Sequence, residues 1–439
     1  MNLKIICISI GILATELLAA QDQTTELSLE QVVKIARLES PDAQTARHSF
    51  RSAYWNYKYY RANYLPTLSL TSDPNLNRAI NKITMGDGSV KFVEQNLLNT
   101  DLTLNLSQNI PWTGGSLFLE TSAQRMDLFS EHKYSWQTSP IMIGYRQSLF
   151  GYNSLKWDKR IEPVRYQEAK KSYVETLELV SANAINKFFA LATAQSNYDI
   201  ASFNYANADT LYRYAQGRYN IGTITENEML QLELNRLTEE TNRMNARIEM
   251  DNCMQELRSY LGIQEEREIR VRVSSRIPDF SINLNEALAL AYENSPDIQT
   301  MKRRKLESES AVARARANAG LKADIYLRFG LTQTADKLPE AYRNLLDQQY
   351  VSLSISLPIL DWGRGKGQVR VARSNRDLVY TQVEQNRTDF ELNVRKLVKQ
   401  FNLQSQRVHI AARTDETAQR RADCLLYTSP SPRDGATSR

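Results

Sequence analysis

A segment near the start of the chain recurs 255 residues further on. Residues 29–45 read LEQVVKIARLESPDAQT, and residues 284–300 read LNEALALAYENSPDIQT. The register continues without a gap to an Arg-Ala-Asn tripeptide that ends both copies. A duplication of this length dictates the architecture, because both copies build the same supersecondary unit. We therefore predict two repeats, at 21–270 and 271–423.

Each repeat is expected to open with about 35 helical residues and then to form strands. A Ser-Pro-Asp tripeptide at 40–42, and again at 295–297, can end one short helix and cap the next. Apolar and hydroxyl residues then alternate along 102–107 and 351–357, which predicts strands with one apolar face. The turn PWTGG at 111–115 follows the first of these strands. Further strands are predicted at 67–75, 117–121, 141–149 and 324–332.

Long helices follow the strands. Residues 155–218 contain no proline after Pro163 and predict a helix of roughly 90 Å. A returning helix, which ends at Gly262, is expected to present a heptad seam. In the second repeat an equally long helix is expected over 365–423. The seam of the returning helix consists of Leu230, Leu234, Leu237, Thr241, Met244 and Ile248.

The two ends of the chain differ from the rest. Residues 1–20 combine a short basic start, an apolar stretch and two alanines, which predicts a secretory signal cut after Ala20. The alternative is a buried first helix. The last residues, 424–439, read CLLYTSPSPRDGATSR and resemble translated sequencing adaptor; the alternative is a natural Ser/Pro-rich tail. With a foreign tail, the natural chain would continue past Asp423 and the second repeat would lack its return helix.

Composition excludes several classes of protein. The 439 residues carry 55 Lys+Arg against 50 Asp+Glu, a mild excess that argues against a nucleic-acid partner. Three Cys and three His in scattered positions build neither a disulfide framework nor a zinc site. A mean hydropathy of -0.50 argues against a bundle of membrane-spanning helices.

A few amphipathic strands per chain cannot close a barrel, whereas several chains together can. Strands that span a membrane require such closure, because no edge is left unpaired in lipid. The sequence therefore predicts an oligomeric tube, with strands in an outer membrane and helices that project into the periplasm.

Two motifs resemble one protein family. The run RYNIG at 218–222, followed by Glu228 and by ELRSYLG at 256–262, resembles the first periplasmic turn and return helix of TolC-type outer-membrane efflux proteins. The run SLPILDWGRG at 356–365 is similar to that family's junction between strand and helix. The resemblance covers 27–423.

The resemblance implies a mainly α-helical protomer with duplicated long hairpins and a membrane β-domain. Three such protomers would form a periplasmic α-barrel and a twelve-stranded transmembrane β-barrel, with four strands from each chain. The first repeat has more strand-like segments than this number requires. We expect either an extra hairpin around 102–121 or loops above the barrel.

The resemblance also implies the function of an outer-membrane channel in a tripartite efflux or type I secretion system. Such a channel is a homotrimer in outer-membrane lipid and works with a periplasmic adaptor and an inner-membrane pump. The tip that contacts the adaptor would consist of Arg218, Tyr219, Gly222 and Glu228. Gly222 suits a turn with positive φ. The alternatives are a helix N-terminal acid for Glu228, and a solvated helix end for Arg218 and Tyr219.

No reaction centre is expected, and neither a cofactor nor a metal. The run GRGKGQ at 363–368 matches no phosphate-binding motif and suits turn glycines. Cys253 is expected to be a buried, inert thiol, and His48, His132 and His409 lack the spacing of metal ligands. A periplasmic coiled-coil adaptor is the alternative function, but the duplication disfavours it. An enzyme on a helical scaffold is disfavoured because no nucleophile, base or metal set converges.

Overall fold

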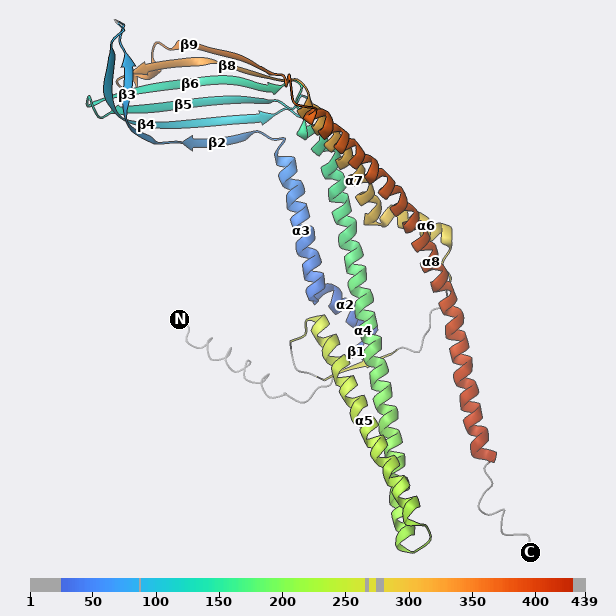
Figure 1. Cartoon of the computed structure of the whole chain (residues 1–439). Coiled ribbons are helices and arrows are strands. Elements are labelled where there is room, and N and C mark those ends of the chain that lie inside the picture. The colour runs from blue at the N-terminus through green and yellow to red at the C-terminus, as the bar shows by residue number, and fades with distance from the viewer. Residues whose placement is uncertain (1–24, 87, 265–267, 274–279, 429–439) are drawn as a thin grey trace, which may run out of the picture. The chain divides into compact units, whose positions relative to one another are not determined.

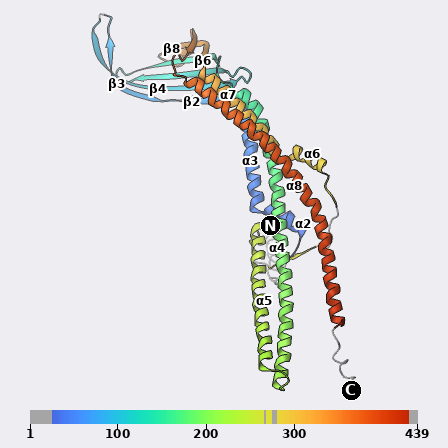
Figure 2. The ribbon, with the colours of Figure 1, turned by 45° about the vertical axis from the view of Figure 1, so that its right-hand side comes forward.

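The computed structural model describes residues 25–86, 88–264, 268–273 and 280–428, so the predicted signal and most of the predicted tail lie outside it. The chain divides into two compact units (Figures 1 and 2). One unit, called the sheet unit below, comprises Ser52–Lys170 and Asn283–Phe401. The other, called the hairpin unit, comprises the described parts of Met1–Arg51, Lys171–Ile282 and Asn402–Arg439.

Within the described residues, the sheet unit contains a seven-stranded antiparallel sheet (Figure 1). Six strands lie side by side in the order β2-β4-β5-β6-β8-β9, and β3 pairs with β4 alone. A 3-10 turn at Glu340–Tyr342 lies between the last two strands. The strands are β2 (Thr67–Ser72), β3 (Asn75–Thr84), β4 (Val90–Asn109), β5 (Ser116–Leu128), β6 (Lys133–Ser148), β8 (Lys322–Ala335) and β9 (Leu346–Ser356).

The expectation of four strands per chain is wrong for this sheet. The extra strands β4 and β5 contain the predicted hairpin around 102–121 and join the middle of the sheet, so they are not loops above it. The PWTGG motif forms the turn between these two strands, and Gly114 in it has φ +79. The sequence did not predict β3, because Arg78 and Lys82 interrupt the apolar alternation that Leu76 and Ile80 begin.

The sheet has one apolar face. Residues paired across neighbouring strands point to the same side, so the register identifies its members. These side chains are exposed in the single chain, with Ile143 at 49% and Leu353 at 57%. They come from six strands: Leu68 and Leu70, Leu102, Leu104 and Leu106, Leu117 and Leu119, Ile141 and Ile143, Phe329, and Val351, Leu353 and Ile355.

The two repeats contain the same short helices, as predicted. The pair α2 (Leu29–Glu39) and α3 (Pro41–Ala62) recurs, at the offset of 255, as α6 (Leu284–Asn294) and α7 (Pro296–Ala319). Each Ser-Pro-Asp ends one helix and starts the next. The Ser40 hydroxyl accepts a hydrogen bond from the Ala43 amide at 3.1 Å, and Ser295 accepts one from the Asp297 amide at 3.1 Å.

The core of the hairpin unit lies where α2, α4 (Ser154–Asn220) and α5 (Glu226–Leu261) meet. Val32, Phe188 and Leu257 are fully buried there. A short parallel ladder between β1 (Thr25–Ser28) and β7 (Ile269–Arg272) borders this core and joins the beginnings of the two repeats. This ladder was not predicted, because four-residue strands carry little periodic signal.

The long helices match their predicted positions, with one difference at the end. The helix α8 (Arg364–Thr428) continues past Asp423, where the sequence predicts a break. Leu425 and Leu426 do not break a helix, and Pro430 is the first residue that would. Among the described helices, none has an apolar stretch long enough to cross a lipid bilayer.

Candidate functional site at the tip of the α4–α5 hairpin

The four residues predicted as a contact site lie at the tip of the hairpin: Arg218 and Tyr219 in the last turn of α4, Gly222 in the connection and Glu228 in the first turn of α5. The connection begins with a regular helix end. Gly222 has φ +77, and its amide donates to the Tyr219 carbonyl at 2.8 Å. The Thr223 amide donates to the Arg218 carbonyl at 2.9 Å. These two hydrogen bonds form a Schellman motif, which satisfies the last carbonyls of the helix. The motif recurs at Gly262, where α5 ends.

The start of α5 is closed by a capping box between Thr225 and Glu228. The Thr225 hydroxyl accepts from the Glu228 amide at 3.3 Å, and the Glu228 carboxylate accepts from the Thr225 amide at 2.9 Å. Hydrogen bonds from the Thr225 backbone and side chain lower the pKa of Glu228, and the charge of Arg218 adds to this effect. The carboxylate therefore has a structural role within its own helix.

The remaining groups of the turn are available to a partner. Arg218 is exposed, Tyr219 is 38% exposed, and a side chain at Gly222 would meet open space. Ile221, which was not predicted as a contact residue, is 74% exposed at the start of the connection. Its sequence signal is an apolar residue beside a turn glycine. A contact role for these residues remains a prediction.

Arginine and tyrosine side chains join the two helices of the hairpin. Three tyrosines of α4 are spaced seven residues apart and carry guanidinium groups of α5 over their rings. The separations between guanidinium carbon and ring centroid are 5.6, 4.0 and 5.5 Å for the pairs Tyr198–Arg247, Tyr205–Arg243 and Tyr212–Arg236, respectively. Arg236 also lies 3.9 Å from Asp209 of α4. The helices therefore meet through polar and aromatic groups along this stretch.

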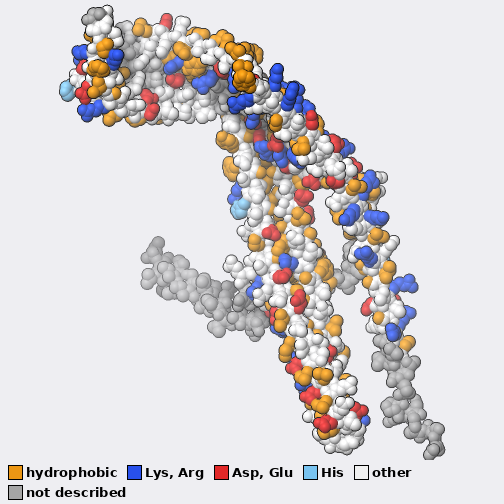
Figure 3. Space-filling model, in the orientation of Figure 1, with side chains coloured by type: hydrophobic (Ala, Val, Ile, Leu, Met, Phe, Trp, Pro, Cys, Tyr) orange, Lys and Arg blue, Asp and Glu red, His pale blue; other side chains and the backbone are white. Residues whose placement is uncertain are grey.

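The predicted heptad seam is not the contact between α5 and α4. Leu234 is 66% exposed, Leu237 45% and Ile248 59%, which leaves an apolar stripe along the outer side of α5. Hydrophobic side chains are visible along this hairpin in Figure 3. The arginines at 236 and 243 stand one residue before the seam, so the face that meets α4 is rotated by about 100° from it. The seam was predicted without a partner, and within the hairpin that partner is not α4.

At the junction between β9 and α8, backbone amides donate hydrogen bonds to a side chain of the same turn. The Asp361 carboxylate accepts hydrogen bonds from Gly363 at 2.9 Å and Gly365 at 2.8 Å. The backbone donors of Gly365 and Gly363 lower the pKa of Asp361. Gly363 has φ +82, as a turn glycine requires. The donors that would hold a phosphate are therefore already occupied, which supports the turn interpretation.

In the sheet unit, ion pairs connect α4 to α7. The Arg303 guanidinium lies 2.6 Å from the Glu168 carboxylate and 2.9 Å from Glu307. Glu307 also pairs with Arg165 at 2.7 Å, and Arg165 pairs with Glu162. Burial raises the pKa of Glu162, and Arg165 opposes the effect. These charges form a network between helices, in which each carboxylate faces a guanidinium.

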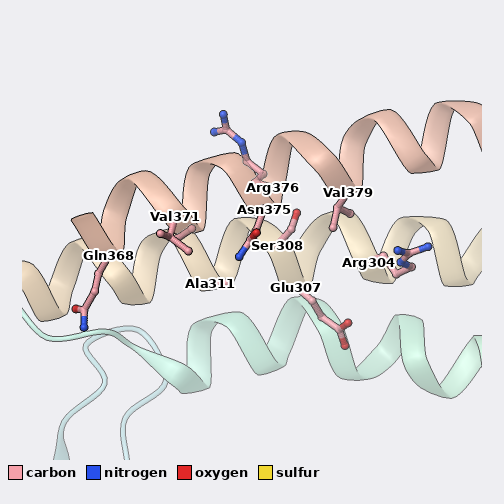
Figure 4. Close-up of a pocket in the computed structure, with 10 residues that line it drawn as sticks. Arg304, Glu307, Ser308, Ala311, Gln368, Val371, Asn375, Arg376 and Val379 are labelled. Carbon is pink, nitrogen blue, oxygen red and sulfur yellow. The ribbon is translucent and has the colours of Figure 1, made fainter. Parts of the chain in front are cut away.

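A groove of about 480 Å³ lies between α7 and α8 (Figure 4). Val371 and Val379 of α8 and Ala311 of α7 form its apolar part. Its charged residues are engaged by neighbours: Arg304 donates to Gln382 at 2.7 Å, and Arg376 pairs with Asp377 at 2.7 Å. The groove is a seam between two helices, and Asn375 and Ser308 lie between them (Figure 4).

The described residues contain no group of three His, Cys, Asp or Glu side chains that could hold a metal ion. Cys253 is half-buried. Its thiol has a raised pKa because of burial and the nearby charges of Glu249 and Glu256. A raised pKa leaves little thiolate, which agrees with an unreactive thiol.

The fold and the tip define a class of protein: an antiparallel sheet with an exposed apolar face, joined to duplicated long helices. No family model matches the chain. No curated protein matches it either. Solved outer-membrane channels do match. The Campylobacter jejuni channel CmeC matches with a TM-score of 0.59 at 16% identity, over 92% of this chain and 78% of CmeC.

Two further structures agree. The outer-membrane protein VceC of Vibrio cholerae matches with a TM-score of 0.61 at 14% identity, over 94% of this chain and 87% of VceC. The transmembrane channel CusC matches with a TM-score of 0.60 at 14% identity, over 93% of this chain and 85% of CusC. The chain therefore has the fold of the TolC-type outer-membrane channels, as its motifs predicted.

Proposed function

We propose that this chain forms the outer-membrane channel of a tripartite efflux or type I secretion system, and that it has no enzymatic role. The observation that carries the proposal is the exposed apolar face of the sheet. A sheet whose two faces both met water would not keep large apolar side chains exposed on six neighbouring strands. A lipid environment accounts for them.

The dimensions of this face fit a bilayer. On β4 the apolar positions Leu98, Leu102, Leu104 and Leu106 extend over about 27 Å along the strand, or about 22 Å along the membrane normal at a tilt of about 35°, which is close to the lipid-facing band of about 25 Å in outer-membrane barrels. Charged and aromatic residues lie at the Leu98 end of this face, where Arg125 of β5 pairs with Thr100. The Arg125 guanidinium lies 5.1 Å from the Tyr134 ring and 5.7 Å from the Trp136 ring. Interfacial aromatic residues of this kind border membrane barrels.

The helices support assembly into a tube. The apolar stripe of α5, with Leu234 and Leu237, needs a cover that α4 does not supply. We propose that neighbouring copies cover it in a homotrimer, whose helices form a periplasmic tunnel. The tip residues Arg218, Tyr219, Gly222 and Glu228 would then meet a periplasmic adaptor that links the channel to an inner-membrane pump.

Fractionation of a Gram-negative host that expresses the chain tests the proposal. We expect the protein in the outer membrane, as an oligomer in mild detergent. Leu104→Arg, on the apolar face, should abolish its membrane recovery, whereas Thr103→Arg, on the opposite face of the same strand, should not. Recovery of the unaltered chain as a soluble periplasmic monomer would overturn the proposal.

A further inference from the structure

We infer that the membrane barrel has eighteen strands, formed when β9 of each copy pairs with β2 of the next. The inference rests on the proposed trimer. Six strands of each chain lie side by side in the sheet, so three copies supply eighteen, whereas the related expectation of twelve assumes four per chain. The inserted hairpin β4–β5 accounts for the difference.

The strand directions permit this closure. Every pairing in the six-stranded order is antiparallel, so β2 and β9 run in opposite directions. Rotation about a barrel axis preserves direction, and the β9 of one copy therefore meets the β2 of the next in antiparallel orientation. An even number of strands per chain is required for this, and bacterial membrane barrels have even totals.

The register supplies the stagger that a barrel needs. Starting from the first residue of β2, successive partners lead to Tyr350 on β9, which is six residues before the end of that strand at Ser356. The residues in this line are Thr67, Ser107, Phe118, Gly144, Arg328 and Tyr350. If the helix-proximal strand ends of neighbouring copies are level, Thr67 lies opposite Ser356 of the next copy.

A six-residue stagger over six strands gives a realistic tilt. One residue per strand corresponds to about 3.3 Å along the strand for about 4.8 Å across it, and hence to a tilt of about 35°. Membrane barrels have tilts of about 35–45°. The single chain thus already contains one third of a barrel with eighteen strands and a shear of eighteen.

The helix-proximal parts of the two outer edges lack the features that protect free edges. Natural edge strands carry lysine, proline or inward-pointing charges, which prevent pairing with another chain. Neither β2, TLSLTS, nor the helix-proximal half of β9, VSLSIS, contains any of these. Both segments instead alternate aliphatic and hydroxyl residues, so a β2–β9 pair would continue the apolar face on one side and the hydroxyl face on the other.

Contacts across β6 hold the inserted hairpin in the wall. On the polar face, the ring of Phe118 from β5 covers Gly144 of β6 and stacks on Tyr326 of β8, with 5.9 Å between the ring centroids. A side-chain carbon at Gly144 would lie 2.0 Å from the Phe118 ring. Glu120 of β5 also pairs with Arg328 of β8 at 3.2 Å. These contacts require β5, β6 and β8 to be neighbours, so β5 cannot leave the wall as a separate plug.

The consequence is a wider membrane pore. At about 4.8 Å between strands and a tilt of about 35°, the backbone diameter is about 34 Å for eighteen strands and about 22 Å for twelve. The cross-section enclosed by the backbone therefore increases about twofold. The polar side chains that would narrow it, such as Arg328 and Glu120, pair with each other along the wall.

Cysteine cross-linking in the full-length chain tests the junction. The same stagger places Ser69 of β2 opposite Ser354 of the neighbouring β9. In a background with Cys253→Ala and Cys424→Ser, the pair Ser69→Cys and Ser354→Cys should form a disulfide between copies on oxidation. The control pair Asn105→Cys and Ser354→Cys, one strand further from the junction, should form none.

Electron microscopy of the trimer tests the strand number directly. We expect eighteen strands. Removal of residues 75–135 joins β2 to β6, which run in opposite directions, and should leave twelve strands with the same Ser69–Ser354 cross-link and about half the barrel cross-section. A membrane trimer with twelve strands, or one without the cross-link, would overturn the inference and leave the channel function intact. A soluble monomer would overturn both.

Discussion

The guanidinium carbon of Arg243 lies 4.0 Å from the centre of the Tyr205 ring, the shortest of the three arginine–tyrosine contacts between α4 and α5. The contact identifies which side of α5 faces α4. Two neighbouring faces of α5 therefore have different roles. The arginines contact α4 within the hairpin, whereas the apolar seam does not contact α4 and is available to another surface.

We expect Arg243→Gln to increase local opening of the α4–α5 hairpin without dissociating the oligomer. Loss of a cation–π contact of about 0.5–1 kcal/mol should increase local opening about two- to fivefold. Hydrogen exchange of the amides near 205 and 243, measured by mass spectrometry, would report this. The control is Arg213→Gln, which removes an exposed arginine paired with Asp209 of its own helix. Equal exchange in both variants would contradict a structural role for Arg243.

Substitutions in the apolar seam of α5 should have the opposite effect: they should disrupt the oligomer and leave the hairpin folded. The double variant Leu234→Glu and Leu237→Glu places charges on the exposed apolar stripe, so it should abolish the oligomer while the helical content of each chain is retained. Native mass spectrometry and circular dichroism measure the two properties. Gln231→Glu, an exposed change on the same helix, should leave the oligomer intact. A stable trimer of the double variant would show that the stripe is not a subunit contact.

The sequence predicted those parts of the fold that have a periodic pattern or a repeat. The long helices follow from periodic runs of tens of residues, the Ser-Pro-Asp caps from the duplicated tripeptide, and most strands from alternation over five to nine residues. The seam was located from its heptad spacing, but no partner could be assigned to it, because periodicity shows which residues form a stripe and not what covers it. The Tyr–Arg contacts could not be predicted from the sequence, because tyrosine and arginine also occur on solvated helix faces.

The tip was predictable for a different reason. Gly222 and the Thr225–Glu228 pair carry local signals, a left-handed helix end and a capping box, that need no tertiary information. Their structural roles could therefore be derived from sequence. A contact with a partner leaves no such signal, and Ile221 became notable only once its exposure was visible.

Gly222→Val should weaken assembly with an adaptor by distorting the turn. A side chain there meets open space, so the cost is confined to the backbone at φ +77, about 1–2 kcal/mol for a residue with a side chain. Site-specific cross-linking of the tip to the adaptor should fall. The control is Gly217→Ala, a helical glycine that also faces open space and should be neutral or slightly stabilising. An unchanged cross-linking yield for the valine variant would contradict the proposed contact.

Glu168 and Glu162, both on α4, should give opposite responses to acid. Burial alone would raise the pKa of Glu168, but the hydrogen bonds from Arg303 and Thr300 outweigh it and lower the pKa below its ordinary value of 4.5. The folded state then binds a proton less readily than the unfolded state. The stability that Glu168 contributes is therefore present above about pH 4.5 and is lost as the pH falls through its folded pKa.

For Glu162 the effect of ionisation on the stability of the fold has the opposite sign. Burial raises its pKa and the negative charge of Asp158 adds to the increase, so its ionisation destabilises the fold as the pH rises above 4.5. Thermal unfolding of the full-length protein between pH 3 and pH 7, scanned at constant ionic strength, compares the variants. Glu168→Gln should reduce the loss of stability on acidification, whereas Glu162→Gln should increase the gain of stability as the pH rises. Parallel pH profiles for the two variants would contradict the opposed environments of these carboxylates.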